Sequence, residues 1–126
     1  MSTPSPLGTA LEPLRRDAGG AAAAFTVDPA DPVLAGHYPG FPVLPGVYLI
    51  EAADRTVRHW RGGGPPVRLT AVARCQFLHP VYPGDRVVTE VTVTGGDGAE
   101  LICRAEARTA RGKVADVRLR YAEEAR

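Results

Sequence analysis

The sequence predicts a single α+β domain in which one long helix packs on an antiparallel sheet. The chain has 126 residues, which is enough for one hydrophobic core and too few for two. A segment near its middle has the apolar period of a helix, and the segments that follow alternate apolar and polar residues as strands do. Glycine-containing turns separate these later segments, as in antiparallel hairpins.

Residues 1–20 are predicted to be a flexible or edge lead-in, and residues 21–126 the folded domain. The lead-in is rich in proline, glycine, alanine and arginine, and only residues 7–14 have weak apolar character. A strand is predicted at 21–28, and it ends where Pro29 and Pro32 remove donors from the ladder. A loop follows as far as Leu44.

A helix is predicted from Pro45 to about Trp60. Proline suits the first helical position because its missing N–H would be unpaired there anyway. The glycine and proline run at 62–66 ends the helix. One side of the helix is apolar and should pack on the sheet: Leu49, Ile50, Ala53, Val57 and Trp60. The charged residues fall together elsewhere: Glu51, Asp54, Arg55 and Arg58.

Four strands are predicted after the helix, at 67–77, 86–94, 99–109 and 113–121. The first has an alternating apolar set: Val67, Leu69, Ala71, Ala73, Cys75 and Phe77. Turns at 95–98 and 110–112 connect the later strands as hairpins. One helix cannot cover both faces of such a sheet, so we expect an edge or face to be shared with a second copy.

Composition and charge exclude several classes of protein. Hydrophobic residues make up 44% and charged residues 23% of the chain, near the averages for globular proteins, so disorder is not favoured. The formal net charge of +1 gives no field that would attract nucleic acid. No window would span a membrane and no secretory pattern is present, so we expect a cytoplasmic protein. Cys75 and Cys103 lack CxxC spacing and are expected to be buried, reduced thiols.

The candidate chemistry lies between His37 and Glu51. Three prolines and two glycines separate these side chains, which makes the connection rigid. A neutral imidazole is a suitable general base near neutral pH, although a lone histidine in a loop is usually structural or solvated. Glu51 also has an ordinary interpretation, because Arg55 at i+4 is placed for a surface ion pair worth a few tenths of a kcal/mol.

Two motifs resemble those of a known family. The run Gly-His-Tyr-Pro-Gly-Phe-Pro-Val-Leu-Pro-Gly-Val at 36–47, followed by Glu51, is similar to the signature of the hotdog-fold β-hydroxyacyl-(acyl carrier protein) dehydratases. The run Phe-Leu-His-Pro-Val-Tyr-Pro-Gly-Asp at 77–85 resembles the F-x-x-P-V-x-P-G-D strand end of that family. The resemblance covers about residues 21–121. It implies a hotdog domain, an antiparallel sheet wrapped around one central helix and dimerising through the sheet.

The resemblance implies a role for each motif residue. His37 would remove a proton from the carbon beside a thioester carbonyl, and Glu51 would donate a proton to the departing 3-hydroxyl. The first N–H groups of the helix, at Gly46 and Val47, would hold the enolate-like charge on the thioester oxygen. The carbonyl of Val43 would hold the His37 ring in one tautomer. The His37 and Glu51 of one site are expected to come from opposite subunits.

Three positions depart from the family pattern. Arg55 stands where the family commonly has glutamine, and it either pairs with Glu51 or faces the carrier protein or the phosphate of the pantetheine arm. Tyr48 replaces an aliphatic residue and Phe41 a more polar one, and simple packing is the ordinary alternative for both. The residues that we expect to line an acyl tunnel are Phe41, Leu44, Tyr48, Arg55 and His79.

The implied activity is a hydro-lyase of fatty-acid or polyketide biosynthesis that forms trans-2-enoyl thioesters. Its implied partner is an acyl carrier protein, whose phosphopantetheine arm carries the substrate, so no metal or cofactor of its own is expected. The expected assembly is a homodimer or a higher oligomer of dimers. Two alternatives stay open: a hotdog acyl thioesterase, in which a carboxylate activates water, and a non-catalytic partner subunit of a heteromeric dehydratase.

Overall fold

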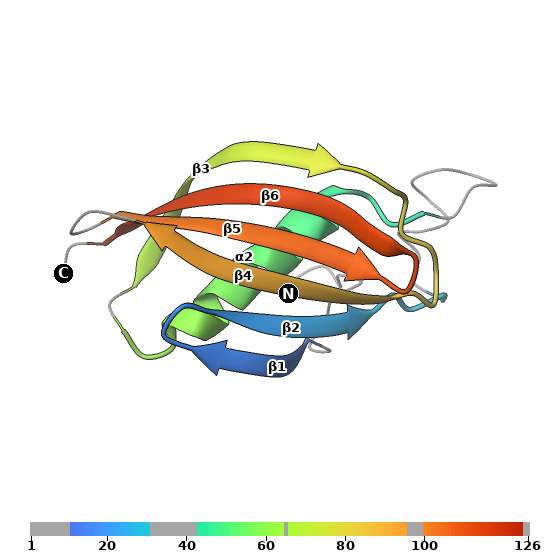
Figure 1. Cartoon of the computed structure of the whole chain (residues 1–126), viewed down its shortest axis with the longest axis horizontal. Helices are drawn as coiled ribbons and strands as arrows, with labels where there is room; N and C mark the ends of the chain where they lie inside the picture. Colours follow the sequence, from blue (N-terminus) through green and yellow to red (C-terminus); the bar gives the residue numbers. More distant parts are fainter. Residues whose placement is uncertain (1–10, 31–42, 65, 96–99, 125–126) are drawn as a thin grey trace.

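The computed structural model describes residues 11–30, 43–64, 66–95 and 100–124, which form a six-stranded sheet curved around one helix (Figure 1). In chain order the elements are β1 (Glu12–Asp17), β2 (Gly20–Thr26), α2 (Val47–Arg61), β3 (Val67–Phe77), β4 (Arg86–Gly95), β5 (Glu100–Thr109) and β6 (Gly112–Glu123). The strand order is β1-β2-β4-β5-β6-β3, and all neighbours are antiparallel. The predicted α+β architecture is therefore confirmed. Within the described ranges, no helix has the length and apolar character needed to cross a membrane.

β1 lies within the segment predicted as a flexible or edge lead-in, and it forms the outermost strand beside β2. Two hydrogen bonds join the end of β1 to the end of α2. The indole N–H of Trp60 donates a hydrogen bond to the carbonyl of Asp17 (2.9 Å), and the Arg16 guanidinium donates one to the carbonyl of Trp60 (3.3 Å). Trp60 therefore joins the helix to a hairpin instead of filling the core, since its ring N–H finds a partner at the surface.

α2 begins two residues later than predicted. Gly46 is the N-cap, and the carbonyl of Pro45 accepts the N–H of Tyr48 (3.0 Å) in a tight turn that precedes the helix. The buried residues of the helix are Leu49, Ala52, Ala53, Thr56 and Val57. Ile50 is partly buried and packs against the same core, so the prediction was wrong for Trp60 alone. The helix packs on β2, β4, β5 and β6 (Figure 1).

β3 departs from the predicted strict alternation. Its pairing with β6 shifts between Leu69 and Ala71 and again between Val72 and Arg74. Residues directly opposite in a ladder share a face. Val72 is paired with the buried Leu119 and so lies on the inner face of the sheet, toward the helix side. Each bulge moves the chain by one residue, and Ala71 leaves the inner face that the pattern predicted for it.

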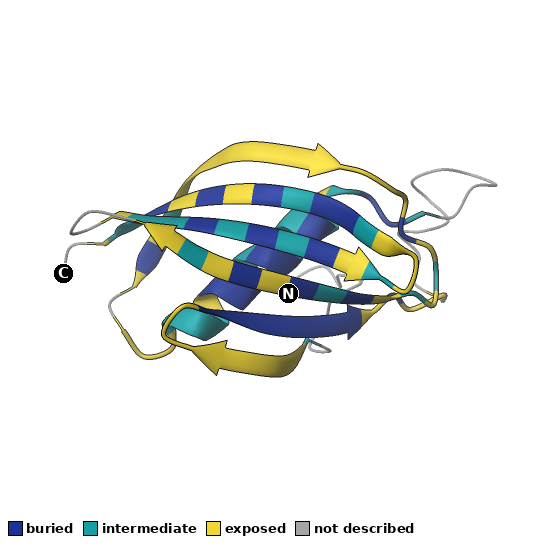
Figure 2. Ribbon diagram, viewed as in Figure 1, coloured by how far each residue is buried: buried dark blue, intermediate teal, exposed yellow. Residues whose placement is uncertain are grey.

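Beyond Leu69, the inner face of β3 is exposed in the described part of the chain. Figure 2 shows this edge strand exposed along almost its whole length, while the inner residues of β4, β5 and β6 are buried against the helix. Val72 is 42% exposed and Phe77 50%. Cys75 is exposed on the same strand, so the expectation of two buried thiols holds only for Cys103. Burial raises the pKa of the Cys103 thiol to about 11.

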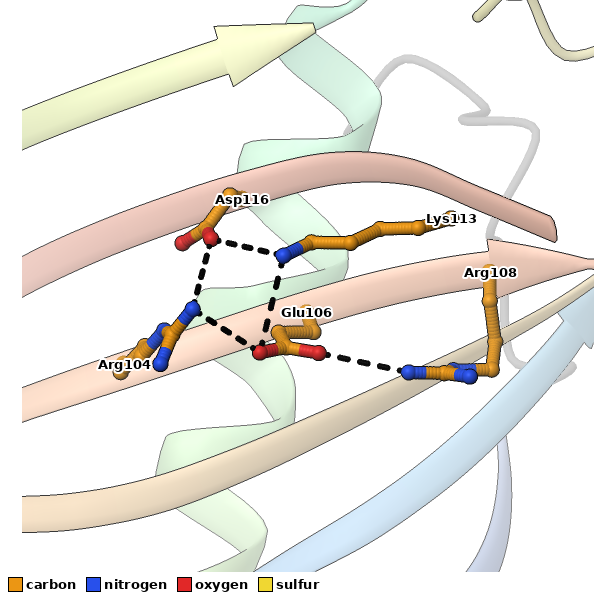
Figure 3. Close-up of polar contacts among 5 residues, drawn as sticks. All are labelled: Arg104, Glu106, Arg108, Lys113 and Asp116. Carbon is orange, nitrogen blue, oxygen red and sulfur yellow. Dashed lines mark hydrogen bonds and ion pairs between the residues drawn. The ribbon is translucent and has the colours of Figure 1, made fainter. Parts of the chain in front are cut away.

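The outer face of β5 and β6 carries a network of ion pairs (Figure 3). Asp116 accepts hydrogen bonds from Arg104 and from Lys113, both at 2.9 Å. Glu106 lies beside it and pairs with Arg104 (3.1 Å) and Arg108 (3.3 Å). The hydrogen bond from Arg104, followed by that from Lys113, lowers the pKa of Asp116 to about 2. The Asp116 side chain is only 14% exposed, so this charge contributes to folding.

Asp116→Asn should lower the free energy of unfolding by about 1–2 kcal/mol at pH 7. The folded-state pKa of Asp116 lies below the unfolded value of about 3.9, so its contribution is present above that pH and is lost as the pH falls toward 2. Urea denaturation between pH 7 and pH 2 should show the difference from wild type shrinking below about pH 5. Glu100→Gln, at an exposed position of β5, is the control. A difference that stays constant down to pH 2 would contradict the assigned charge effect.

Candidate active site

The start of α2 is held against the connection between β3 and β4. The N–H of Leu44 donates a hydrogen bond to the carbonyl of Val81 (2.8 Å), which fixes the approach to the helix. Both residues are buried, at 5% and 1% exposure. The two segments that carry the sequence motifs are therefore joined by a backbone hydrogen bond in the core.

The N–H groups of Gly46 and Val47 are the first donors of the helix. The hydrogen bonds of the helix begin after them, where the N–H of Leu49 donates to the carbonyl of Gly46 (2.9 Å). Among the described residues, neither Gly46 nor Val47 has a backbone acceptor within hydrogen-bond distance. Val47 is 63% exposed. Such donors, at the positive end of the helix dipole, suit an oxygen that gains negative charge.

Gly46 allows an aromatic ring to cover the start of the helix. A Cβ placed on Gly46 would lie 2.6 Å from Cζ of Phe77 and 2.7 Å from its Cε2, which is closer than real carbon contacts allow. Phe77 ends β3 and begins the second motif. Sequence reasoning did not identify it as a site residue, although its place in the F-x-x-P run was the available signal. The contact brings the two motifs into one site.

Residues of the two motifs line an open pocket of about 280 Å³. Its walls come from the start of α2 and the corner after β3: Val43, Leu44, Pro45, Gly46, Leu49, Phe77, Leu78, His79, Pro80 and Val81. Four predicted site residues thus lie together, namely Val43, Leu44, Gly46 and His79. The lining does not include the other described candidates, which are Val47, Tyr48, Glu51 and Arg55. A mostly apolar wall beside the first helix donors suits an apolar group that carries a polar oxygen.

Glu51 lies just over one turn into α2 and pairs with Arg55. The Nη2 atom of Arg55 is 3.4 Å from Oε2 of Glu51, and the two side chains keep 35% and 38% of their surface exposed. The pair anticipated from the i+4 spacing is therefore present in the single chain. At this exposure such a pair contributes only about 0.3–0.5 kcal/mol. It is weak enough to be exchanged for another contact.

His37 and Phe41 lie outside the described residues. The assignments of His37 as base and of Phe41 as a tunnel residue stay predictions from the sequence. Tyr48 is partly buried and packs against the hydrophobic core, in line with the ordinary alternative for an aromatic residue at that position.

A buried tyrosine fixes the helix face that carries Glu51. The hydroxyl of Tyr121, a fully buried residue of β6, donates a hydrogen bond to Oδ1 of Asp54 (2.8 Å). Asp54 in turn pairs with Arg58 (3.0 Å). Desolvation, reinforced by the Asp54 carboxylate, raises the pKa of Tyr121 far above its ordinary range. Sequence periodicity grouped Asp54 with Arg58, but the contact with Tyr121 joins segments that no local pattern relates.

Curated relatives support a dehydratase family. The 3-hydroxyacyl-(acyl-carrier-protein) dehydratase FabZ of Syntrophobacter fumaroxidans is 31% identical over 97 residues, which are 71% of this chain and 65% of that protein. The chain spans less than two thirds of the length of the curated relatives that it matches.

Solved structures share the fold. The dehydratase heterocomplex ApeI:P from Xenorhabdus doucetiae superposes with a TM-score of 0.75 at 13% identity, covering 98% of this chain and 88% of that one. The fluoroacetyl-CoA thioesterase FlK gives a TM-score of 0.69 at 17% identity, covering 84% of this chain and 87% of that one. Likeness at these identities concerns the fold alone, which is the hotdog fold.

The family itself follows from a longer match. Residues 14–115 match the family model described as ApeI-like, ApeI dehydratase. The matched range includes both motifs, the whole of α2 and the pocket between them. The chain therefore belongs to the ApeI-like dehydratase family.

Proposed function

We propose that this protein dehydrates 3-hydroxyacyl thioesters on an acyl carrier protein to trans-2-enoyl thioesters, in fatty-acid or polyketide biosynthesis and in the cytoplasm. The observation that carries the proposal is the pocket at the start of α2. There Gly46 presents a helix N-terminus to an apolar space, and the histidine and carboxylate of the family motif flank that helix start in the sequence. Membership of a dehydratase family supports the same reaction.

The reaction assigns one task to each residue. His37 takes the proton from the carbon beside the thioester carbonyl, and the electrons of that C–H bond form the new double bond. The C–O bond to the 3-hydroxyl breaks, and the hydroxyl leaves as water with a proton from Glu51. The N–H groups of Gly46 and Val47 stabilise the negative charge on the thioester oxygen while it lasts. The carbonyl of Val43 orients the ring of His37.

A second subunit completes the site in this proposal. β3 has an unpaired edge in the described chain, and its inner face exposes Val72 and Phe77. Exposed apolar edge strands are places where another chain pairs. We propose a homodimer, or an oligomer of dimers, in which His37 and Glu51 of one site come from different subunits. A different hotdog subunit is the alternative partner, and the ApeI:P dehydratase of similar fold is a heterocomplex.

A thioesterase is the second candidate activity. The half-exposed carboxylate of Glu51, held beside Arg55, could activate water against the same thioester. The thioesterase FlK shares the fold. The histidine motif at 36–47 favours the dehydratase, because water activation by a carboxylate does not use a base at that position.

One assay separates the dehydratase, the thioesterase and the non-catalytic partner subunit. The protein is incubated with a carrier protein that bears a 3-hydroxyacyl group, and the mass of the intact carrier is followed. Loss of one water is the expected result. Loss of the whole acyl group would indicate a thioesterase, and the same loss from a carrier with a saturated acyl group would confirm it. An unchanged mass would indicate that the protein is a non-catalytic partner subunit.

A further inference from the structure

A second pocket lies beside the first one at the corner after β3. It has a volume of about 310 Å³ and is lined by His79, Pro80, Tyr82 and Arg111. His79 and Pro80 also line the pocket at the start of α2. The two pockets are therefore neighbours that share two wall residues. A long substrate whose reactive end lies in the first pocket can extend past His79 into this second one, which we name the corner pocket.

Arg111 is held in place on the wall of the corner pocket. It lies in the turn between β5 and β6, and its guanidinium carbon is 4.9 Å from the centre of the Tyr82 ring, within the range of a cation–π contact. Its Nη2 pairs with Oδ2 of Asp85, and the same carboxylate oxygen accepts the N–H of Tyr82 (2.8 Å). The hydrogen bond to Asp85 raises the pKa of Arg111, so the cation is permanent.

The pair with Asp85 leaves most of the donors of Arg111 available. A guanidinium has five N–H donors in a planar fork, and one nitrogen, Nη2, makes the contact with Asp85. The Arg111 side chain keeps 51% of its surface exposed, whereas that of Asp85 keeps 14%. Asp85 thus orients the cation from the protein side while solvent reaches the rest of it. This is the arrangement of an anchored arginine that can bind a second anion.

His79 adds a donor at the junction of the two pockets. The backbone of this corner is hydrogen-bonded to β6. The N–H groups of Leu78 (2.8 Å) and His79 (3.4 Å) both donate to the carbonyl of Val114. His79 is exposed and lines both pockets. An imidazole has an N–H donor in either protonation state. An anion in the corner pocket can therefore reach two kinds of donor.

We propose that the corner pocket binds the phosphate of a phosphopantetheine arm, with Arg111 as the anion-binding residue and His79 at the junction. The inference rests on the proposed function, which places the thioester of that arm at the start of α2. The phosphodiester lies at the other end of the arm and carries one negative charge. A fork of guanidinium donors matches its oxygen atoms, as it does in other phosphate sites.

The test compares two substrates that differ only in the phosphate: a 3-hydroxybutyryl thioester of 4′-phosphopantetheine and one of pantetheine. Wild type should prefer the phosphorylated substrate in kcat/KM by about tenfold or more, the scale of one charge-assisted hydrogen bond. Arg111→Gln should bring the ratio of kcat/KM for the phosphorylated substrate to that for the unphosphorylated substrate close to one. Arg111→Lys should keep part of it, because a charge remains. Arg108→Gln, a β5 arginine that pairs with Glu106, is the matched control and should keep the wild-type ratio.

Asp85→Asn distinguishes anion binding from a purely structural pair. If Arg111 serves only to close the turn, Asp85→Asn and Arg111→Gln should behave alike. Both variants should then lower kcat/KM for the two substrates by the same factor. If Arg111 binds phosphate, Asp85→Asn keeps a clear preference and Arg111→Gln does not. An unchanged ratio in Arg111→Gln would overturn the proposal.

Calorimetric titration with 4′-phosphopantetheine and pantetheine, neither of them acylated, gives the same comparison without turnover. Failure of dehydration therefore tests the proposed function, while equal affinity of wild type for the two arms contradicts the phosphate site alone.

Discussion

Glu51→Gln should lower the rate of dehydration by about 10²-fold or more, the usual scale for removing a general acid. Glutamine has nearly the shape of glutamate but no proton to give to the departing hydroxyl. Loss of the half-exposed pair with Arg55 at 3.4 Å should itself change the free energy of unfolding by less than about 0.5 kcal/mol. Carrier mass in single-turnover experiments and urea denaturation measure the two effects separately.

Asp54→Ala is the contrasting variant on the same helix face. Asp54 accepts the hydrogen bond of the buried Tyr121 hydroxyl, so its loss leaves that group unpaired and should cost about 1–3 kcal/mol of stability. Its activity per folded molecule should fall much less than that of Glu51→Gln. The account of Glu51 would be contradicted if the two variants lost activity in proportion to stability, because Glu51 would then be a structural residue.

Arg55 does not prevent the acid role of Glu51. The pair contributes a few tenths of a kcal/mol, whereas a hundredfold rate effect corresponds to about 2.7 kcal/mol. Closure of the site by substrate or by a second subunit can therefore separate Glu51 from Arg55 at little cost. The ion pair of the single chain and the proposed acid role are thus compatible, because they belong to different states of the site.

His37→Ala should lower the rate of dehydration by about 10²- to 10⁴-fold, because no other base is assigned to the carbon beside the thioester. Added imidazole should restore part of the rate, since a small base can occupy the space of the missing ring. Rates measured with and without imidazole on the same carrier substrate check both expectations.

His59→Ala is the control for His37→Ala. His59 lies in the last turn of α2, where a cation is favoured by the helix dipole, and far along the helix from the Gly46 end. This variant should keep the wild-type rate and gain nothing from imidazole. A wild-type rate in His37→Ala itself would remove His37 from the mechanism.

The main elements of the fold were predictable because strong local signals bound them. β3 was predicted at the residues where it lies, since the Gly-Pro run before it and the proline corner after it allow no longer strand. The two bulges within β3 were not predictable. Alanine and valine occupy both faces in its middle, so the apolar pattern does not distinguish Ala71 from Val72. The pairing with β6 decides the register there.

The sequence predicted which residues belong to the candidate site better than it predicted which residues contact one another there. The motifs identified Gly46 and His79, and the structure brings them to one pocket. The contact between Gly46 and Phe77, like that between Asp54 and Tyr121, joins distant parts of the chain through packing. Such contacts depend on where the helix crosses the sheet, which propensity and periodicity do not specify.

The most direct test of the shared site mixes two inactive subunits. His37→Ala and Glu51→Gln chains with different tags are unfolded, refolded together in equal amounts and assayed on a 3-hydroxyacyl carrier protein. Each mixed dimer would contain one intact site, so the mixture should regain about a quarter of the wild-type rate. Native mass spectrometry verifies that mixed dimers form. If mixed dimers are present and the rate stays at the level of the separate variants, the proposal of one site built from His37 and Glu51 of two subunits is wrong.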